Sequence, residues 1–280
     1  MPNGSETSSR AGWTRFWLMS ELARAKVNLS LHITGKRADG YHLLDSIVVF
    51  PEVGDVLRHE GRGLRMSGPF AGGLSTEDNL ITKAAALLGV APDIHLIKNL
   101  PVASGIGGGS ADAAATLRLL GKGTLPDGLP LGADVPACLI SKPLRMRGIG
   151  EQLALLPPLP DYAIVLVNSG DAVSTAAIFS ALSRVDNPAG DALPEGLSAT
   201  EFFSFIATQR NDMQHAAMNI CPSIASVLAA LQAQPSCAVA RMSGSGGTCF
   251  GLFATLADAE LAAAEIQRAE PSWWVVAAKG

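Results

Sequence analysis

Four of the five residues between positions 105 and 109 are glycine, within the stretch LPVASGIGGGSADAA that spans residues 100–114. Glycine weakens strands and helices, but it allows the backbone to approach another group very closely. An alternating segment at 93–101 precedes the loop, and an alanine-rich segment with a helical pattern follows at 110–121. A strand, a glycine loop and a helix N-terminus present several backbone N–H groups to one point, which suits a polyphosphate.

Two better-known glycine loops fit this stretch poorly. A Walker A loop needs Gly-Lys-Ser or Gly-Lys-Thr, and the chain contains neither. Gly105, Gly107 and Ser110 come close to the dinucleotide pattern G-x-G-x-x-G, but no second strand ends in an acidic residue about twenty positions later. A plain turn rarely needs so many glycines. We therefore favour a phosphate loop of another kind, in which Ser110 either caps the helix or faces a phosphate or a metal.

Two charged residues stand in unusual surroundings. Asp134, in LGADVP, is a single acid among apolar neighbours, which favours a shifted pKa or a cationic partner. The alternative is a structural aspartate that caps a turn before Pro136. Lys26 lies in the middle of an alternating segment at 23–33, which predicts a strand. By itself, that position is equally typical of a lysine on an edge strand or at the surface.

The remaining segments predict a mixture of strands and helices without a regular βαβ rhythm, which favours an α+β fold. Asp39-Gly40 indicates a hairpin turn, and the proline-rich segment at 155–162 is the best candidate for a domain boundary. Further strands are expected at 47–60, 61–73, 160–170, 237–254 (around a glycine turn) and 272–279. Further helices are expected at 75–89 (capped by Ser75 or Thr76), 201–218, 222–234 and 256–270.

Composition excludes several classes of protein. The net charge of -4 and the lack of a basic run argue against nucleic-acid binding. No apolar run approaches the length of about 18 residues that spans a membrane. The four cysteines show no C-x-x-C pairing, so we expect free thiols and a cytoplasmic protein. Residues 1–19 form a disordered extension in this interpretation and carry no function.

The glycine loop resembles that of the GHMP small-molecule kinases. Three other segments extend the resemblance: ARAKVNLSLHITGKRADGYHLLDSIV at 23–48, LGADVPACL at 131–139 and RMSGSGGTCFGLF at 241–253. The resemblance runs from about Leu22 to the C-terminus, and the combination of A-K-x-N, G-Y-H and L-G-A-D-V-P makes it specific. Within the family, these segments are most similar to members that phosphorylate the 2-hydroxyl of a cytidyl-diphosphate methylerythritol in the non-mevalonate isoprenoid pathway.

The resemblance implies a two-domain GHMP kinase architecture, with an N-terminal ATP-binding domain at 20–158 and a C-terminal domain at 159–280. The active site is then expected in the cleft between them. Asp134 is implied as the general base toward the substrate hydroxyl, with Lys26 beside it to keep it ionised. ATP and Mg²⁺ are the expected cofactors, although the sequence shows no carboxylate cluster for the metal. The expected partner is the small-molecule substrate, and the chain is expected to be a monomer or a weak homodimer.

The resemblance also assigns binding residues. Tyr41 is expected to stack on the cytosine, while His42 reads the hydrogen-bonding edge of the base. Other residues implied on the substrate side are Asn28, Asn79, Thr175 and Phe179. Those implied on the nucleotide side are Lys98, Pro101, Val102, Ala103, Ser104, Gly105, Ile106, Gly107, Gly108, Gly109, Ser110 and Ala111. The turn at 243–247 resembles a third family motif, whose glycines approach the phosphates and whose Ser245 is a candidate donor.

Two other functions remain open at this point. Another GHMP kinase would act on mevalonate-type or homoserine-like alcohols, but such a substrate has no base for the G-Y-H segment to bind. A nucleotide-binding protein without catalysis would have no need for both Lys26 and Asp134. Segments 89–98 and 121–131 are short for the family, and the resemblance places both toward the nucleotide.

Overall fold

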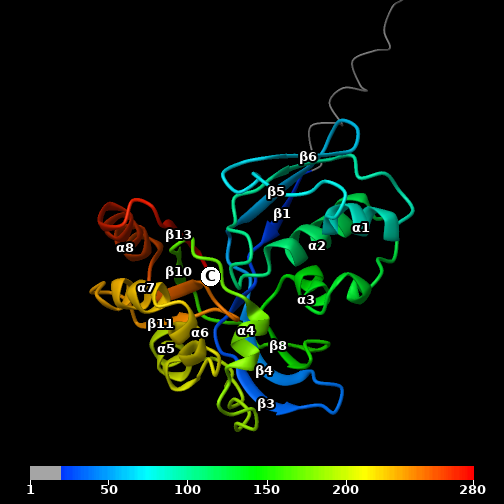
Figure 1. Ribbon diagram of the computed structural model, residues 1–280. Coiled ribbons are helices and arrows are strands. Elements are labelled where there is room, and N and C mark those ends of the chain that lie inside the picture. Colours follow the sequence, from blue (N-terminus) through cyan, green and yellow to red (C-terminus); the bar gives the residue numbers. More distant parts are fainter. Residues whose placement is uncertain (1–19) are drawn as a thin grey trace, which may run out of the picture.

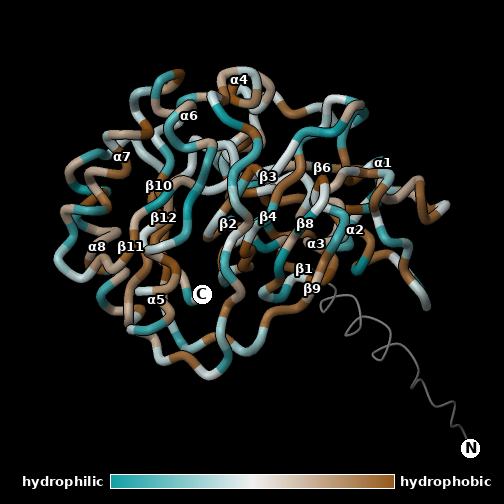
Figure 2. Tube along the Cα trace, turned by 90° about the horizontal axis from the view of Figure 1, so that it is seen from below, coloured by the Kyte–Doolittle hydropathy of each residue, from teal (hydrophilic) through white to brown (hydrophobic). Residues whose placement is uncertain are grey.

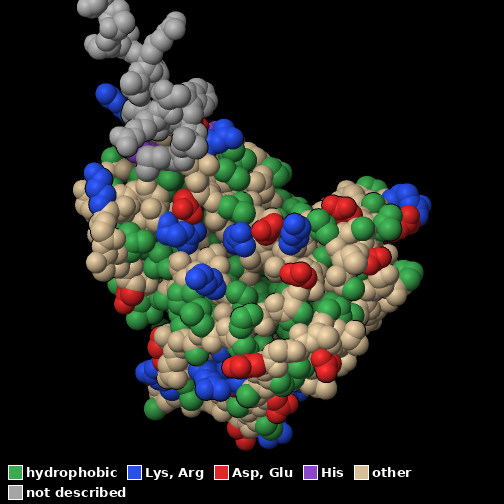
Figure 3. All heavy atoms as spheres, turned by 180° about the vertical axis from the view of Figure 1, so that it is seen from behind, with side chains coloured by type: hydrophobic (Ala, Val, Ile, Leu, Met, Phe, Trp, Pro, Cys, Tyr) green, Lys and Arg blue, Asp and Glu red, His purple; other side chains and the backbone are tan. Residues whose placement is uncertain are grey.

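The computed structural model describes residues 20–280, so the predicted extension at 1–19 lies outside the described residues. Helices and strands are mixed along the chain without a regular alternation, and the strands form three sheets. The predicted α+β class is therefore confirmed. In the described part of the chain, no helix has the length and apolar character needed to cross a membrane. Charges of both signs are interspersed on the face seen in Figure 3.

The first sheet carries the strand that leads into the glycine loop. Its strands, in spatial order, are β1 (Ser20–Arg24), β5 (Gly54–His59), β7 (Ile94–Ile97) and β6 (Leu64–Ser67). Two helices, α1 (Leu80–Leu87) and α2 (Gly108–Leu120), pack against each other, and α2 also covers β1 and β5. Because β7 ends immediately before the glycine loop and α2 begins within it, this layer holds both ends of the loop.

The second sheet carries the predicted hairpin. Its strands are β2 (Val27–Asn28), β3 (His32–Lys36), β4 (His42–Val49), β8 (Leu144–Gly148) and β9 (Gln152–Leu155). Strands β3 and β4 pair antiparallel across the Asp39-Gly40 turn, as the sequence predicts. A short 3-10 helix (Leu129–Leu131) and α3 (Val135–Ile140) come before β8. The second sheet therefore supports the hairpin loop, whereas α3 packs against α2.

The third sheet forms the C-terminal half of the molecule, on the left of Figure 1. Its strands, in spatial order, are β11 (Val239–Met242), β12 (Thr248–Phe253), β10 (Ala163–Asn168) and β13 (Trp274–Lys279). The helices of this half are α4 (Thr175–Ser180), α5 (Ala199–Thr208), α6 (Gln214–Ile220), α7 (Ser223–Gln232) and α8 (Leu256–Ala269). Every residue of β10 is buried, as its β-branched run predicts.

Two hydrophobic clusters contain residues of both the second and the third sheet. One of them brings Val27 and Ile47 of the second sheet against Ile164 and Phe250 of the third, with Phe202 of α5 closing one side. Figure 2 shows the resulting order of layers, with α7 and α8 outside, then the third sheet, then β2 and β4, and α1 and α2 on the far side. The predicted boundary between residues 158 and 159 falls between β9 and β10 and stays a prediction.

Two helix predictions need correction. Helix α1 begins at Leu80 and not near residue 75, because Asn79 caps it through Oδ1, which accepts from Ile81 N at 3.0 Å. Ser75 closes a separate turn by accepting from the N–H groups of Glu77 and Asp78. The acidic residues that suggested a first helical turn lie in that preceding turn instead.

The predicted helix at 201–218 is two helices, α5 and α6, separated by an extended segment. Arg210 O accepts from Leu31 N at 2.8 Å, and Leu31 O accepts from Asp212 N at 2.9 Å. Between them, the Asn211 amide donates to the carbonyls of Met242 and Gly244. These long-range hydrogen bonds replace those of a continuous helix, and they connect the second and third sheets.

The predicted strand at 23–33 also divides. Residues 20–24 pair in the first sheet and residues 27–28 in the second, so Ala25 and Lys26 form the crossing between two sheets. Lys26 therefore does not lie in mid-strand. It lies where the chain changes sheets, and its side chain is nearly buried there.

Arg145 and Asp45 form a buried ion pair on the second sheet. Arg145 Nε and Nη2 each donate to one oxygen of Asp45 at 2.6 Å, and the guanidinium also donates to the carbonyls of Gly190 and Asp191. Burial alone would raise the pKa of Asp45, but hydrogen bonding and charge from Arg145 outweigh it and hold that pKa below its usual value. Through the carbonyls of Gly190 and Asp191, Arg145 connects the long segment between α4 and α5 to the second sheet.

We expect Arg145→Met to lower the free energy of unfolding by about 3–5 kcal/mol at pH 7, because it leaves a buried carboxylate without its partner. Arg147→Met is the matched control, since Arg147 lies 3.5 Å from Asp45 but is largely exposed. It should cost about 1 kcal/mol or less. Equal effects of the two variants in urea unfolding would contradict this account.

The same pair predicts a pH dependence. Since the pKa of Asp45 is lower in the folded protein, the pair contributes stability above the unfolded value of about 3.9 and loses it as pH falls further. In Arg145→Met, burial without the arginine raises the pKa of Asp45, so the difference in unfolding free energy between wild type and this variant should shrink as pH falls toward about 4 and continue to shrink below it. A difference that stays constant down to pH 2 would show that charge pairing is not the cause.

Candidate active site

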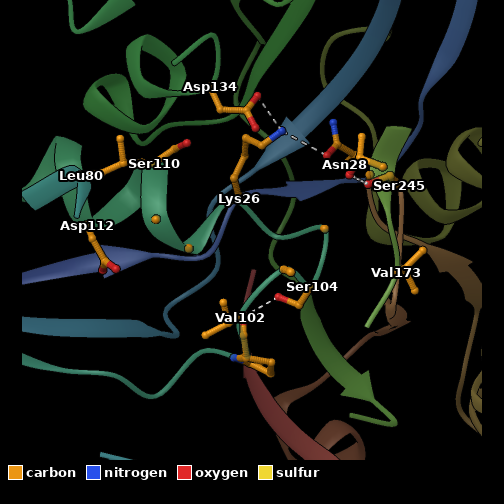
Figure 4. Close-up of a pocket in the computed structure, with 18 of the residues that line it drawn as sticks. Lys26, Asn28, Leu80, Val102, Ser104, Ser110, Asp112, Asp134, Val173 and Ser245 are labelled. Carbon is orange, nitrogen blue, oxygen red and sulfur yellow. Dashed lines mark hydrogen bonds and ion pairs between the residues drawn. The ribbon is translucent and has the colours of Figure 1, made fainter. Parts of the chain in front are cut away.

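A cavity of about 490 Å³ lies where the three sheets meet, and Figure 4 shows its lining. Most of the residues that the sequence predicted for the site contribute to this one cavity. From those predictions it contains Lys26, Asn28, Asn79, Lys98, Pro101, Val102, Ala103, Ser104, Gly105, Gly107, Gly108, Gly109, Ser110, Asp134, Thr175 and Phe179. The side chains of Ile106 and Ala111 are buried in the core instead. Segment 121–131 lies outside the lining.

Lys26 and Asp134 meet at the centre of the cavity. Lys26 Nζ lies 3.0 Å from Asp134 Oδ1, and the two side chains are 7% and 37% exposed, respectively. Asp134 precedes the first residue of α3, but its carboxylate makes no capping hydrogen bond with that helix. The carboxylate is therefore held by a nearly buried ammonium group while one face of it remains open to the cavity.

A chain of hydrogen bonds through Asn28 and Ser46 holds the side chain of Lys26 in place. Lys26 Nζ donates to Asn28 Oδ1 at 3.3 Å, and the Asn28 amide donates to Ser46 Oγ at 2.7 Å. Ser46 in turn donates to the carbonyl of Ser30. The backbone N–H of Lys26 donates to Ile106 O at 2.8 Å, which ties the lysine to the glycine loop. These contacts give Asn28 the role of orienting the lysine.

The glycine loop runs directly into α2. The N-cap is Gly107, with φ 64°, and no side chain caps the helix, so Ser110 lies in the first turn and is not the cap. A Cβ at Gly107 would lie 3.2 Å from Lys26 Cβ and 3.3 Å from Cε, so glycine is what allows the loop to pass so close to the lysine. The free N–H groups at the start of α2 thus lie at the cavity, beside the catalytic candidates.

A second glycine turn, at 243–247, packs against the first. A Cβ at Gly105 would lie 2.5 Å from Gly246 O and 2.7 Å from Ser243 O. Ser243 Oγ donates to Gly105 O at 3.1 Å and accepts from Asn28 N at 3.0 Å. The glycines of this turn were predicted to approach phosphates, and the structure shows that they approach the first glycine loop. Ser245 still lines the cavity, where its hydroxyl lies 2.7 Å from that of Thr175.

Lys98 is not a solvated residue at a strand end. It is buried and forms ion pairs with two buried carboxylates, Asp55 and Asp112, the second at 2.8 Å from Nζ. Burial would lower the pKa of Lys98, but the two carboxylates outweigh it and raise that pKa. A Cβ at Gly108 would lie 3.1 Å from Lys98 Nζ, which places the three charges directly beneath the first turn of α2.

Of the substrate-side predictions, Asn28, Asn79, Thr175 and Phe179 line the cavity, whereas Tyr41 and His42 are not among its lining residues. The rings of His42 and Phe179 are stacked at 4.6 Å between centroids, which brings the β3–β4 hairpin against α4. Tyr41, at the tip of the hairpin, is 60% exposed. Asn79 lies near the opposite end of the lining, and its side chain is engaged in capping α1. The structure therefore does not bring Asn79 together with the aromatic residues.

Three functional candidates were not singled out from the sequence. Asp112 stood inside the glycine-loop motif and Ser243 inside the third motif, so attention to the polar residues of both motifs could have found them. Asp55 gave no such signal, because it lies in an ordinary strand of the first sheet. Its role depends on contacts with residues more than forty positions away.

Gly105→Ala tests the contact between the glycine segments. A side chain at φ +74° costs about 1–2 kcal/mol, and overlap with two carbonyl groups adds about 1–3 kcal/mol. Gly123→Ala is the matched control, since Gly123 has φ +73° with open space around it. Thermal unfolding should show a clearly larger loss for Gly105→Ala. Equal losses would mean that the close contact adds nothing beyond backbone strain.

Family models match two parts of the chain. The model of the GHMP kinases N terminal domain matches residues 79–142, and that of the GHMP kinases C terminal region matches residues 201–272. A protein of Paracoccus denitrificans named 4-diphosphocytidyl-2-C-methyl-D-erythritol kinase is 53% identical over 266 residues, covering 92% of this chain and 95% of its own. A protein of the same name from Dinoroseobacter shibae is 51% identical, with coverage of 90% and 92%.

Solved structures of GHMP kinases also superimpose on this chain. A crystal structure of 4-(cytidine 5'-diphospho)-2C-methyl-D-erythritol kinase superimposes with a TM-score of 0.73 at 31% identity, covering 94% of this chain and all of that one. Mevalonate kinase of L. major, at 17% identity and a TM-score of 0.60, shares the fold. From the identity, the coverage and the superposition together, this chain belongs to the 4-diphosphocytidyl-2-C-methyl-D-erythritol kinase family of GHMP kinases.

Proposed function

We propose that this chain transfers the γ-phosphoryl group of ATP to the 2-hydroxyl of 4-diphosphocytidyl-2-C-methyl-D-erythritol. The observation that carries the proposal is the ion pair of Lys26 and Asp134, at the centre of a cavity with a glycine loop at one end and aromatic rings at the other. The names of close relatives supply the substrate. The geometry supplies a place for each part of the reaction.

Asp134 accepts the proton of the substrate hydroxyl as the hydroxyl oxygen forms a bond to the γ-phosphorus. The bond from that phosphorus to the bridging oxygen breaks, and ADP leaves with the electron pair. Lys26 supports this step because its ammonium group lies 3.0 Å from Asp134 and offsets the negative charge that develops nearby. A carboxylate open to the cavity on one face can reach a hydroxyl there.

The glycine loop provides the phosphate end of the cavity. Backbone N–H groups at the start of α2 and the positive end of that helix favour a polyphosphate at Gly107–Ser110. Mg²⁺ would arrive with ATP and neutralise charge on its phosphates. Among residues 20–280 no group of three His, Cys, Asp or Glu side chains is placed to hold a metal, so ATP itself supplies most of the ligands in this proposal.

The aromatic residues provide the end that binds cytosine. Phe179 lines the cavity and Tyr41 lies next to His42 on the hairpin, so the base can stack on rings from two elements. Burial, followed by the charge of Lys36, lowers the pKa of His42, so its ring is neutral at pH 7. A neutral imidazole offers one donor and one acceptor to the edge of the base.

Asp134→Asn should lower kcat by about 10²- to 10⁴-fold, because an amide cannot accept the hydroxyl proton. The measurement is ADP release with Mg-ATP and the cytidyl substrate. Asp161→Asn, at an exposed carboxylate outside the cavity, is the control and should leave kcat unchanged. A fall of less than about threefold in Asp134→Asn would remove the general base from this mechanism. Absence of turnover in folded wild-type protein that binds ATP would favour a non-catalytic nucleotide-binding protein.

Tyr41→Ala should raise KM for the cytidyl substrate by about tenfold through loss of stacking, with KM for ATP unchanged. Because Tyr41 is mostly exposed, its removal should leave the melting temperature as it is. Tyr41→Phe keeps the ring and should retain a KM close to that of wild type. If the alanine variant bound the cytidyl substrate normally, or if a base-free alcohol served equally well, another GHMP kinase activity would replace this one.

A further inference from the structure

The cluster of Lys98, Asp55 and Asp112 contains one more carboxylate than ammonium groups. All three side chains are buried, and they lie beneath the first turn of α2, where the proposed function places the phosphates of ATP. With both carboxylates ionised, the cluster would place an uncompensated negative charge below a site for a polyanion. Such a charge would be costly in the interior and unfavourable for the nucleotide.

The hydrogen bonds show which carboxylate can hold a proton. Asp55 Oδ1 accepts from the backbone N–H groups of Asn99 at 2.6 Å and Leu100 at 2.8 Å, and its Oδ2 accepts from Lys98 Nζ. Both oxygens of Asp55 are therefore occupied by hydrogen-bond donors. Asp112 has a single donor, Lys98, on Oδ2, and its buried Oδ1 has no hydrogen-bond partner.

We propose that Asp112 carries a proton on its unpartnered oxygen when nucleotide binds, so that the three side chains are together neutral beneath the glycine loop. Asp112 is then a positioning residue, which acts on the nucleotide through the charge of the cavity wall. This inference rests on the proposed function, because it assumes that the loop binds phosphates.

Electrostatics of the cluster agree with this assignment. Burial, and after it the charge of Asp55, raises the pKa of Asp112 to about 7 in spite of Lys98. Lys98, which follows β7, and Asp55 on β5 are the charged groups that act on Asp112. The proton of Asp112 can therefore be lost and regained within an accessible pH range.

The test measures binding of ADP, with Mg²⁺ present, to the whole chain by calorimetry between pH 6.5 and 8.5. Asp112→Asn keeps the shape of the side chain and fixes it in a neutral form. In wild type, Kd should rise with pH relative to that variant, so that the ratio of the two Kd values increases about fivefold or more across the range. Titration of the nucleotide's own phosphates cancels in this ratio.

Asp78→Asn is the control for simple loss of a negative charge at the cavity. Asp78 lines the cavity but is largely exposed, and a hydrogen bond from Lys83 together with its charge holds the pKa of Asp78 below its usual value. Its removal should therefore change Kd by the same factor at every pH. A second readout is proton uptake at pH 7.5, from titrations in two buffers of different ionisation enthalpy. Wild type should take up more protons per ADP than Asp112→Asn.

The outcomes separate this inference from the proposed function. A ratio of Kd values that stays flat with pH, or equal proton uptake by the two proteins, overturns the inference while the kinase function stands. Loss of ADP binding in Asp112→Asn at every pH also overturns it, because the charged carboxylate would then be required. A folded wild-type protein that fails to bind ADP at any pH overturns the proposed function itself.

Discussion

The contact between the two glycine segments determines how the rest of the site is arranged. Gly105 lies against the carbonyls of Ser243 and Gly246, where no side chain would fit, and Ser243 Oγ bridges Gly105 O to Asn28 N. One hydroxyl thus joins the glycine loop, the strand that follows Lys26 and a turn of the C-terminal half. Because these are backbone contacts at close range, small displacements of any one segment would move the other two.

The two lysines of the cavity differ in the number of carboxylates that they pair with. Lys26 has one carboxylate partner, Asp134, so that pair is neutral overall and its carboxylate stays open to the cavity. Lys98 has two partners, both buried, and holds the base of the glycine loop between β5 and α2. The first arrangement leaves an acceptor available for a proton, while the second fixes a loop between rigid elements. The same residue type therefore leaves a carboxylate open to the cavity in one place and holds a loop in position in the other.

The sequence predicted the α+β class, the hairpin at Asp39-Gly40 and the strand, loop and helix around the glycines, because these depend on local patterns. It missed the break between β1 and β2 at Lys26 and the interruption at Asn211, because both are fixed by hydrogen bonds to distant segments. The meeting of Lys26 with Asp134 came from the family resemblance. The role of Asp55 could not be predicted from the sequence, because it depends on hydrogen bonds from the backbone N–H groups of Asn99 and Leu100.

The crossing of the chain between two sheets explains why Lys26 occupies the middle of the cavity. The first sheet, through β7 and α2, supplies the end with the glycine loop, and the β3–β4 hairpin of the second sheet with α4 supplies the stacked rings of His42 and Phe179. Ala25 and Lys26 are the residues at which the chain passes from the first sheet to the second. A side chain at that crossing therefore lies between the two ends, and Asp134, which precedes α3, meets it there. A donor phosphate and an acceptor hydroxyl held at opposite ends would therefore meet beside this ion pair.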